Sequence, residues 1–460
     1  MSVYDLEQIR LPLQYGSIEP DARDRNESSL EKARDPKKVT AHACLLDRQE
    51  KIAQKLGLLP TKTDPTALAQ NKQTLADFHS GRIDRTATIE RLATDNRLPI
   101  EVALGMLAQF AEYGHLELHL TDVCNLNCQG CTYAVARVGA APADVLPFDS
   151  IANLGNLPNA PKSIVVVGGG EPTLYGKGQS RQFHDAMNTL ATFARRGTRI
   201  GLITNGVIFP ELDGGWQEHV RWVRVSIDAA KPATYCTFRG RDKLPIVFNN
   251  FLKYLLRTRI KQVGVSFLYS NGNVDDYSDF VCKVYHLVVG SCPTELPRVN
   301  IQFRPLRCAD PKDNQKFAVS KEQINRQLQK LTQACEGDQA LRAFVRRQTN
   351  ATALWGGNEH PLLRFSACRY SSVAGIVRAS GKIIPCFCKV GAAGFVVGDL
   401  RALDLPALGL RKLLIRSIVS ESECSPETCR MSFINKVVED YHEDKVVPPG
   451  LGELISEQGI

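Results

Sequence analysis

Long apolar runs are absent from the sequence: eighteen apolar residues never follow one another, so no membrane-spanning helix is predicted. The first residues, from Met1 to Glu7, lack the basic and apolar regions that a secretory signal peptide needs. There is also no arginine-rich arm and no basic run with interleaved aromatic residues, so nucleic-acid binding has little support. These absences lead us to expect a cytoplasmic protein with no membrane partner.

Cysteine, in contrast, is plentiful, with 14 residues in a chain of 460. Because the cytosol keeps thiols reduced, these cysteines are not expected to form disulfides, and binding of metal ions or clusters is the better use for many of them. The net charge of +8 would attract an acidic electron donor such as a flavodoxin or a ferredoxin. An ordinary solvated surface explains this charge equally well.

Three cysteines, Cys124, Cys128 and Cys131, stand within eight residues in a CxxxCxxC pattern, with no fourth nearby. An iron-sulfur cubane takes one thiolate per iron, so three cysteines leave one iron open for a ligand that is not protein. The alternatives are reduced thiols or a structural zinc site, although such a site normally has four protein ligands and paired CxxC spacing. The pattern favours a [4Fe-4S] cluster with one open iron.

The cysteine loop follows an alternating strand pattern, Leu116–Leu120, and a second apolar run, Ile164–Val167, leads into a glycine-rich turn. That turn is Gly168, Gly169, Gly170 and Glu171. Together the two motifs resemble those of the radical S-adenosylmethionine (SAM) superfamily. The resemblance implies that the loop binds the cluster and that the turn holds the methionine amino group of SAM. Reduction of the cluster would then cleave SAM to a 5'-deoxyadenosyl radical, which abstracts hydrogen from a substrate.

One position departs from this family. The residue before the third cysteine is commonly aromatic, and here it is Gly130. Packing against the adenine of SAM therefore cannot be assigned to that side chain, and Tyr133 is close enough in sequence to take its place.

Apolar runs and helical patterns alternate from residue 116 onward, with helical segments such as Phe183–Arg195 and Val247–Arg257 between the runs. The alternation predicts an α/β fold in which a parallel sheet curls into a partial (β/α)6 TIM-like barrel, with its chemistry at the carboxyl ends of the strands. The six predicted strands are Leu116–Leu120, Ser163–Val167, Arg199–Ile203, Trp222–Ile227, Val263–Leu268 and Val299–Arg304.

Polar residues stand at or near the ends of these strands, and the resemblance implies that they contact the ribose and carboxylate of SAM. They are Asn205, Ser226 and Ser266, with Arg239 downstream of the fourth strand. A guanidinium suits a carboxylate because it can grip it in two places. The alternative for each is a cap, a turn or a surface residue.

The regions on either side of the barrel divide by composition. We predict a flexible leader (1–40), a helical N-terminal module (41–113), the barrel (114–310), a helical bridge (311–360), an auxiliary cluster domain (361–435) and a C-terminal tail (436–460). The helical module is either a winged-helix unit able to capture a leader peptide or a cap over the barrel mouth.

A second group of cysteines, Cys368, Cys386, Cys424 and Cys429, begins with a CX12GX4C pattern around Gly381. The pattern resembles the twitch domain, a shortened SPASM domain. This resemblance implies a second, auxiliary [4Fe-4S] cluster closed by four thiolates, with zinc as the alternative.

A further cysteine, Cys388, is spare by this count. It is either a catalytic hydrogen-atom donor to a substrate radical or a packed thiol.

The motifs leave the substrate open. The leading hypothesis is an enzyme that oxidises, cross-links or epimerises a peptide or protein. A small molecule such as a sugar, an aminocyclitol or a cofactor precursor is the second hypothesis, and an iron-sulfur redox sensor or binding protein is the third.

Overall fold

The computed structural model describes residues 65–96, 100–107, 114–131, 133, 144–154, 160–176, 181–210, 215–306, 315–348, 368, 370–389, 395–403, 408, 412, 429 and 435. The predicted leader, the predicted tail and Cys424 lie outside these described residues. The first helical stripe expected in the N-terminal module, at 52–59, lies outside them as well.

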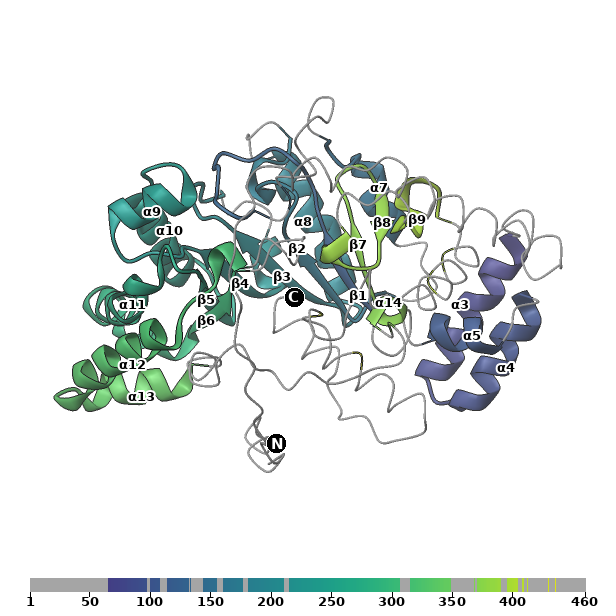
Figure 1. The fold of residues 1–460 in the computed structure, drawn as a ribbon. Coiled ribbons are helices and arrows are strands. Elements are labelled where there is room, and N and C mark those ends of the chain that lie inside the picture. Colours follow the sequence, from purple (N-terminus) through teal and green to yellow (C-terminus); the bar gives the residue numbers. More distant parts are fainter. Residues whose placement is uncertain are drawn as a thin grey trace, which may run out of the picture.

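The described strands form one sheet in the order β6-β5-β4-β3-β2-β1-β7-β8-β9. Strands β1 to β6 are parallel to their neighbours, and the sheet does not close on itself (Figure 1). All six predicted strands are confirmed, with ends that differ from the prediction by at most two residues. The strands are β1 (His115–Leu118), β2 (Ser163–Val166), β3 (Arg199–Thr204), β4 (Val220–Ser226), β5 (Gln262–Tyr269) and β6 (Val299–Pro305).

Helices cross over between successive parallel strands, as such strands require. They are α7 (Phe148–Asn153), α8 (Arg181–Ala194), α9 (Pro232–Arg239), α10 (Leu244–Arg257) and α11 (Tyr277–Ser291). Short 3-10 turns connect several of them: η4 (Pro172–Leu174), η5 (Trp216–Glu218), η6 (Val274–Asp276) and η7 (Pro293–Arg298). The predicted partial α/β barrel is therefore present as an open sheet with helices.

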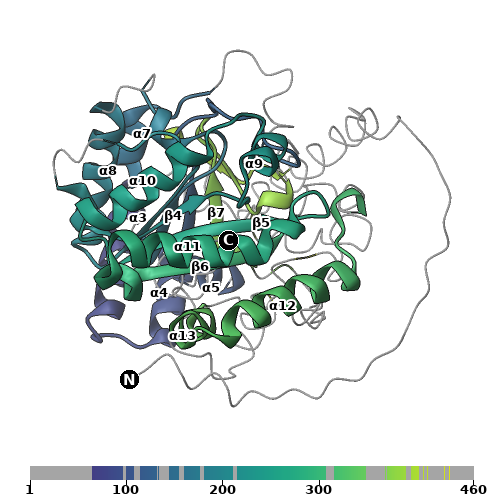
Figure 2. The same ribbon diagram turned by 90° about the vertical axis from the view of Figure 1, so that its left-hand side faces the viewer.

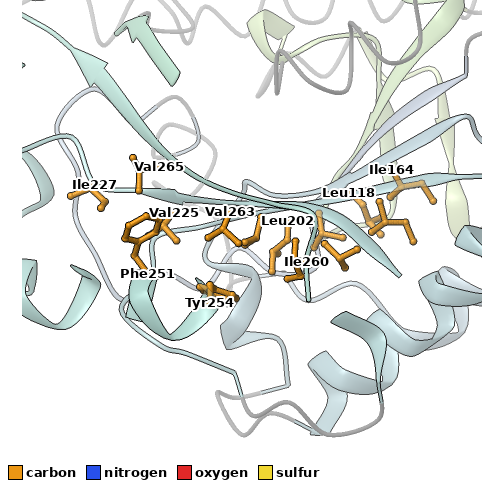
Figure 3. Packing of buried hydrophobic residues seen from close by; sticks show 14 of the residues in the cluster. Leu118, Ile164, Leu202, Val225, Ile227, Phe251, Tyr254, Ile260, Val263 and Val265 are labelled. Carbon is orange, nitrogen blue, oxygen red and sulfur yellow. The ribbon is translucent and has the colours of Figure 1, made fainter. Parts of the chain in front are cut away.

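The main core lies between the sheet and these helices, as Figure 3 shows. Leu202, Val225 and Val263 point to the same side as Phe251 and Tyr254 of α10, and all five are almost fully buried. Each such side chain contributes about 1.5–3 kcal/mol when it is removed from water. Alternate residues of the strands therefore fix which face of the sheet is covered.

The opposite face of the sheet is polar. Glu117, Arg224, Ser266 and Gln302 lie on that face and are buried, and Ser226 is partly buried beside Ser266. Because strand residues alternate between faces, the same strands supply an apolar core on one side and a polar lining on the other.

The C-terminal part adds three strands to the same sheet, β7 (Ala374–Val377), β8 (Lys382–Ile384) and β9 (Gly398–Asp399). Strand β7 is parallel to β1, whereas β8 and β9 run antiparallel. Gly398 of β9 pairs with Ile383 of β8. The turns η10 (Phe387–Lys389) and η12 (Leu400–Ala402) complete the described part of this region.

The N-terminal helices α3 (Pro65–His79), α4 (Arg85–Asn96) and α5 (Ile100–Leu107) pack on one another at one end of the molecule (Figure 1). The sequence did not predict α3, which buries Leu75. Helix α5 contacts α14 (Tyr370–Val373), which leads into the amino-terminal end of β7. Strand β7 is parallel to β1, and the cysteine loop follows the carboxyl end of β1. These described helices therefore lie at the amino-terminal ends of the strands, opposite to the cysteine loop, and do not cap it.

The predicted helical bridge (311–360) contains two helices in its described part, α12 (Lys321–Glu336) and α13 (Gln339–Arg347). Ser320 and Gln323 form a capping box that starts α12. Asp338 caps α13, because its side chain accepts a hydrogen bond from a backbone N–H of that helix. Figure 2 shows both helices beyond the β6 edge, where α12 packs against α11.

Candidate functional site

The cysteine loop begins just after β1 and is hydrogen-bonded to the glycine-rich turn that follows β2. The N–H of Gly170 donates to the carbonyl of Thr121 at 2.7 Å, and the N–H of Glu171 donates to the carbonyl of Val123 at 2.8 Å. Because β1 and β2 are parallel neighbours, two motifs that are distant in sequence meet at one edge of the sheet. The two halves of the sequence motif are thus one local structure.

Glycine is required in this turn for two physical reasons. Gly168 and Gly169 have positive φ angles of 56° and 68°, which residues with a Cβ rarely adopt. A Cβ on Gly170 would lie 1.9 Å from the carbonyl oxygen of Val123. Any larger residue at position 170 must therefore displace the start of the cysteine loop.

Glu171 is only 2% exposed, and its carboxylate is held from several sides. Oε1 accepts from the hydroxyls of Thr204 (2.6 Å) and Thr173 (2.8 Å) and from the backbone N–H of Thr173 (3.2 Å). Oε2 accepts from the N–H of Asn205 at 2.7 Å. Burial raises the pKa of Glu171, and these hydrogen bonds oppose the rise. Since a carboxylate oxygen can accept two hydrogen bonds, Oε2 keeps capacity for a cationic group.

The middle of the cysteine loop is fixed by the last turn of α9. The N–H of Gln129 donates to the carbonyl of Phe238 at 2.8 Å, and the N–H of Asn127 donates to the carbonyl of Arg239 at 3.2 Å. These are carbonyls that a helix end leaves without an internal partner. Gly240 ends the helix with a φ of 76°, and a Cβ there would lie 2.6 Å from the Asn127 carbonyl oxygen.

Arg239 also contacts the loop through its side chain. Nη1 donates to the sulfur of Cys128 at 3.3 Å, and Nη2 forms an ion pair with Asp228. Burial would lower the pKa of Arg239, but the Asp228 carboxylate and the Cys128 sulfur raise it, so the guanidinium stays charged. Contact between Arg239 and the carboxylate of SAM stays a prediction. The sequence missed Asp228, although a carboxylate just beyond an apolar strand is a signal that could have found it.

Tyr235 of α9 is fully buried, and its hydroxyl has no hydrogen-bond partner among the described residues. Burial raises the pKa of this hydroxyl, and the charge of Arg239 opposes that rise. Cys128, Asp228 and Glu171 add to the rise of this pKa electrostatically. A buried hydroxyl without a hydrogen-bond partner is uncommon in proteins, because nothing offsets its removal from water. A tyrosine at helical spacing gives no sequence signal of this arrangement.

The other predicted SAM contacts lie on the neighbouring strands. Asn205 donates from its side chain to Asn125 of the cysteine loop at 2.6 Å. Ser226 and Ser266 face each other across β4 and β5, with 3.2 Å between their hydroxyl oxygens. The structure brings Asn205 directly onto the loop, and it pairs the two serines on adjacent strands.

Tyr133 lies on the far side of the glycine-rich turn. Its hydroxyl donates to Glu117 at 2.5 Å, and its ring meets the ring of His119 edge-on at 4.7 Å. His119 also contacts Glu117, at 2.9 Å. A Cβ on Gly168 would clash with both rings. The packing of Tyr133 on adenine stays a prediction. Its side chain also forms a polar group with Glu117 and His119, which the sequence did not indicate.

Gly130 stands where related sequences have an aromatic residue, and the structure gives a reason. Its φ angle is 61°, and a Cβ would lie 2.7 Å from the side chain of Leu306. Leu306 follows β6, so the far edge of the sheet reaches back to the cysteine loop. An aromatic side chain at position 130 would have to displace it.

Residues 118–281 match the Radical SAM superfamily. This segment contains the cysteine loop, the glycine-rich turn and α9. It is a radical SAM domain. Membership implies a [4Fe-4S] cluster and SAM as its cofactors.

The side chains of the radical SAM domain fit these cofactors. Three thiols on one loop match a cubane with one open iron. The anionic Glu171 suits the ammonium group of SAM, and the cationic Arg239 with the unpartnered Tyr235 hydroxyl suits anionic and polar groups.

Several solved structures are similar to this chain. SuiB of Streptococcus suis bound to the precursor peptide SuiA has a TM-score of 0.48 and 11% identity, covering 78% of this chain and 84% of SuiB. The structure of anSMEcpe with bound AdoMet has a TM-score of 0.45 and 17% identity, covering 69% and 83%. BtrN in complex with AdoMet and 2-DOIA has a TM-score of 0.35 and 11% identity, covering 68% and 92%. No curated protein matches the sequence significantly.

The second group of cysteines is described in part. Cys368 is buried, Cys386 and Cys429 are partly buried, and Cys424 lies outside the described residues. Asn435 donates to the sulfur of Cys429 at 3.7 Å and accepts from the N–H of Tyr370 at 2.6 Å. This asparagine, which the sequence did not indicate, links Cys429 to the segment that follows Cys368. The auxiliary cluster and its twitch-like domain stay a prediction.

Cys388, the predicted hydrogen-atom donor, lies in η10, two residues after Cys386. Its catalytic role also stays a prediction.

Within the described residues, no three His, Cys, Asp or Glu side chains converge to hold a single metal ion. A cubane takes one thiolate per iron, so its ligands are spread over several metal atoms and this observation does not bear on it. None of the helices in the described ranges is long and apolar enough to cross a membrane.

Proposed function

We propose that this protein is a radical SAM enzyme that abstracts hydrogen from a peptide or protein substrate. The observation that carries the chemical part is the cysteine loop, which is bound on one side by the glycine-rich turn and on the other by the last turn of α9. Both contacts are made by backbone groups, so the loop is held independently of any side chain that contacts substrate.

The roles of the chain's own residues follow from their contacts and charges. Cys124, Cys128 and Cys131 bind three irons, and the fourth iron stays open to SAM. Glu171, oriented by Thr204 and Asn205, accepts hydrogen bonds from the ammonium group of SAM. When bound, the reduced cluster supplies the electron that cleaves SAM and generates a radical able to abstract hydrogen from an unactivated carbon.

The polar face of the sheet supports a substrate site close to this chemistry. Ser226 is the last residue of β4 and pairs with Ser266 of β5, on the same face of the sheet as Gln302 of β6. In sheets of this type the carboxyl ends of the strands carry the reacting groups.

A peptide is the proposed substrate class because the spacing of Cys368, Cys386, Cys424 and Cys429 resembles that of the twitch domain. Enzymes with twitch and SPASM domains often mature ribosomal peptides. The auxiliary cluster would accept an electron from the substrate radical, which gives a net oxidation or a cross-link.

The decisive measurement is formation of 5'-deoxyadenosine by the anaerobically reconstituted protein after reduction with dithionite. An enzyme produces it in the wild type and not in Cys128→Ala. If none forms while the clusters remain intact, the redox-sensor hypothesis replaces this proposal.

The substrate class is tested with short precursor peptides encoded beside the gene. A deuterium-labelled peptide should transfer deuterium into 5'-deoxyadenosine. Transfer from a sugar or an aminocyclitol, with none from any peptide, would favour a small-molecule substrate instead.

A further inference from the structure

Arg239 and Asp228 form a buried ion pair with more contacts than the binding of a carboxylate group alone requires. Both side chains are buried, at 7% and 0% exposure, and the guanidinium donates to the Cys128 sulfur at 3.3 Å. Asp228 pairs with the other terminal nitrogen of the guanidinium, Nη2.

Asp228 is itself held in an unusual backbone conformation. Its φ angle is 62°, and among the described residues no other non-glycine residue has a positive φ angle. Its Oδ1 accepts from the N–H of Leu268 at 2.7 Å, and Asn273 donates to its carbonyl at 2.8 Å. Such conformations cost about 1–3 kcal/mol and persist only where the surroundings hold them. The chain therefore maintains a strained residue to place one carboxylate against Arg239.

We infer that Asp228 and Arg239 act as positioning residues that set the reduction potential of the cluster through the sulfur of Cys128. This inference rests on the proposed cluster at Cys124, Cys128 and Cys131. A cationic donor to a ligand sulfur stabilises the extra electron of the reduced cluster, because hydrogen bonds and charge at the sulfurs set the potential of such clusters. Asp228 limits that effect by its opposite charge and fixes the direction of the guanidinium.

The test is a redox titration of the cluster followed by electron paramagnetic resonance, without SAM and then with it. In Arg239→Gln the potential without SAM should become more negative by at least about 59 mV, which is tenfold in the equilibrium constant of a one-electron reduction. In Asp228→Asn the potential should shift in the opposite direction, because the positive charge remains and the negative one is lost. Asparagine tolerates positive φ, so this substitution preserves the backbone.

Arg241→Gln is the matched control. Arg241 is exposed and lies two residues from Arg239. Its substitution removes the same charge from the same segment, so the cluster potential of this variant should equal that of the wild type. Arg239→Lys should recover part of the shift, because the charge returns without the planar geometry.

The outcomes separate this inference from the proposed function. If the wild type binds no cluster, the proposed function itself fails. If Arg239→Gln keeps its iron and its potential without SAM but binds SAM less tightly, Arg239 serves only the carboxylate and the inference is overturned. If Arg239→Gln loses its iron, Asp228→Asn decides: a potential equal to that of the wild type overturns the inference, and a positive shift supports it.

Discussion

The two groups of cysteines are held in different ways. The loop of Cys124, Cys128 and Cys131 is bound by backbone hydrogen bonds from the glycine-rich turn and from α9. In the C-terminal group, the side chain of Asn435 links the sulfur of Cys429 to the N–H of Tyr370. A site held by backbone groups depends on the fold as a whole, whereas a site held by one side chain can be altered by one substitution.

We expect the largest difference between the two groups when one cysteine is removed from each. Cys128→Ala should abolish formation of 5'-deoxyadenosine, because the open cluster loses a ligand. Cys368→Ala should lower the iron content from about eight to about four per chain while the first cluster stays, given four irons per cubane. Anaerobic iron and sulfide counting with product analysis distinguishes the two variants. Equal iron loss in both would mean that the two groups do not form separate sites.

Glycine substitutions sharpen the comparison at the level of the backbone. Gly170→Ala should destabilise the protein by about 2–3 kcal/mol and stop SAM cleavage, because its Cβ meets the Val123 carbonyl at 1.9 Å. Gly381→Ala should cost about 1 kcal/mol, because the φ of 82° is strained but the contacted Arg401 side chain can move. Denaturant unfolding and the yield of 5'-deoxyadenosine measure both. Normal SAM cleavage by Gly170→Ala would contradict the backbone linkage.

Two asparagines offer a matched pair with smaller effects. Asn205→Ala removes the side-chain bond to Asn125, and Asn435→Ala removes those to Tyr370 and Cys429. Each should cost about 1–2 kcal/mol. Asn435→Ala should also reduce iron loading of the C-terminal group, whereas Asn205→Ala should leave loading of the first group intact and weaken SAM binding. Iron loss from the first group in Asn205→Ala, with full loading of the C-terminal group in Asn435→Ala, would contradict this comparison.

The smallest effect concerns pH and the strand that carries the cysteine loop. Burial lowers the pKa of His115 in β1 from 6.5 to about 4, while its Nδ1 contacts the Ser163 hydroxyl at 2.6 Å. Between these values the unfolded chain binds a proton that the folded chain does not, so stability falls as the pH falls through this window. From pH 7.5 to 5.5 the loss due to His115 is about 1 kcal/mol. His115→Asn should remove that part of the pH dependence in urea unfolding, and an unchanged slope would show that His115 does not titrate in this way.

The sequence predicted the parts of the structure that depend on local pattern. The six parallel strands follow from short apolar runs, and the superfamily follows from Cys124 to Cys131 with Gly168 to Glu171. Errors arose where no local signal exists. Strand β7 was missed because its pairing partner, β1, lies far away in the sequence.

The sequence by itself determined which residues could bind a cluster and where the strands lie along the chain. Cysteine spacing and the alternation of apolar runs with helical patterns are both local features of the sequence. Only the tertiary structure decided what holds those residues. The carbonyls of α9 meet the loop, the carboxylate of Asp228 meets Arg239, and the Tyr235 hydroxyl is buried without a partner among the described residues. The contact between α9 and the loop joins Arg239 and Cys128, which are 111 residues apart and are brought together by the pairing of parallel strands, which no local pattern encodes.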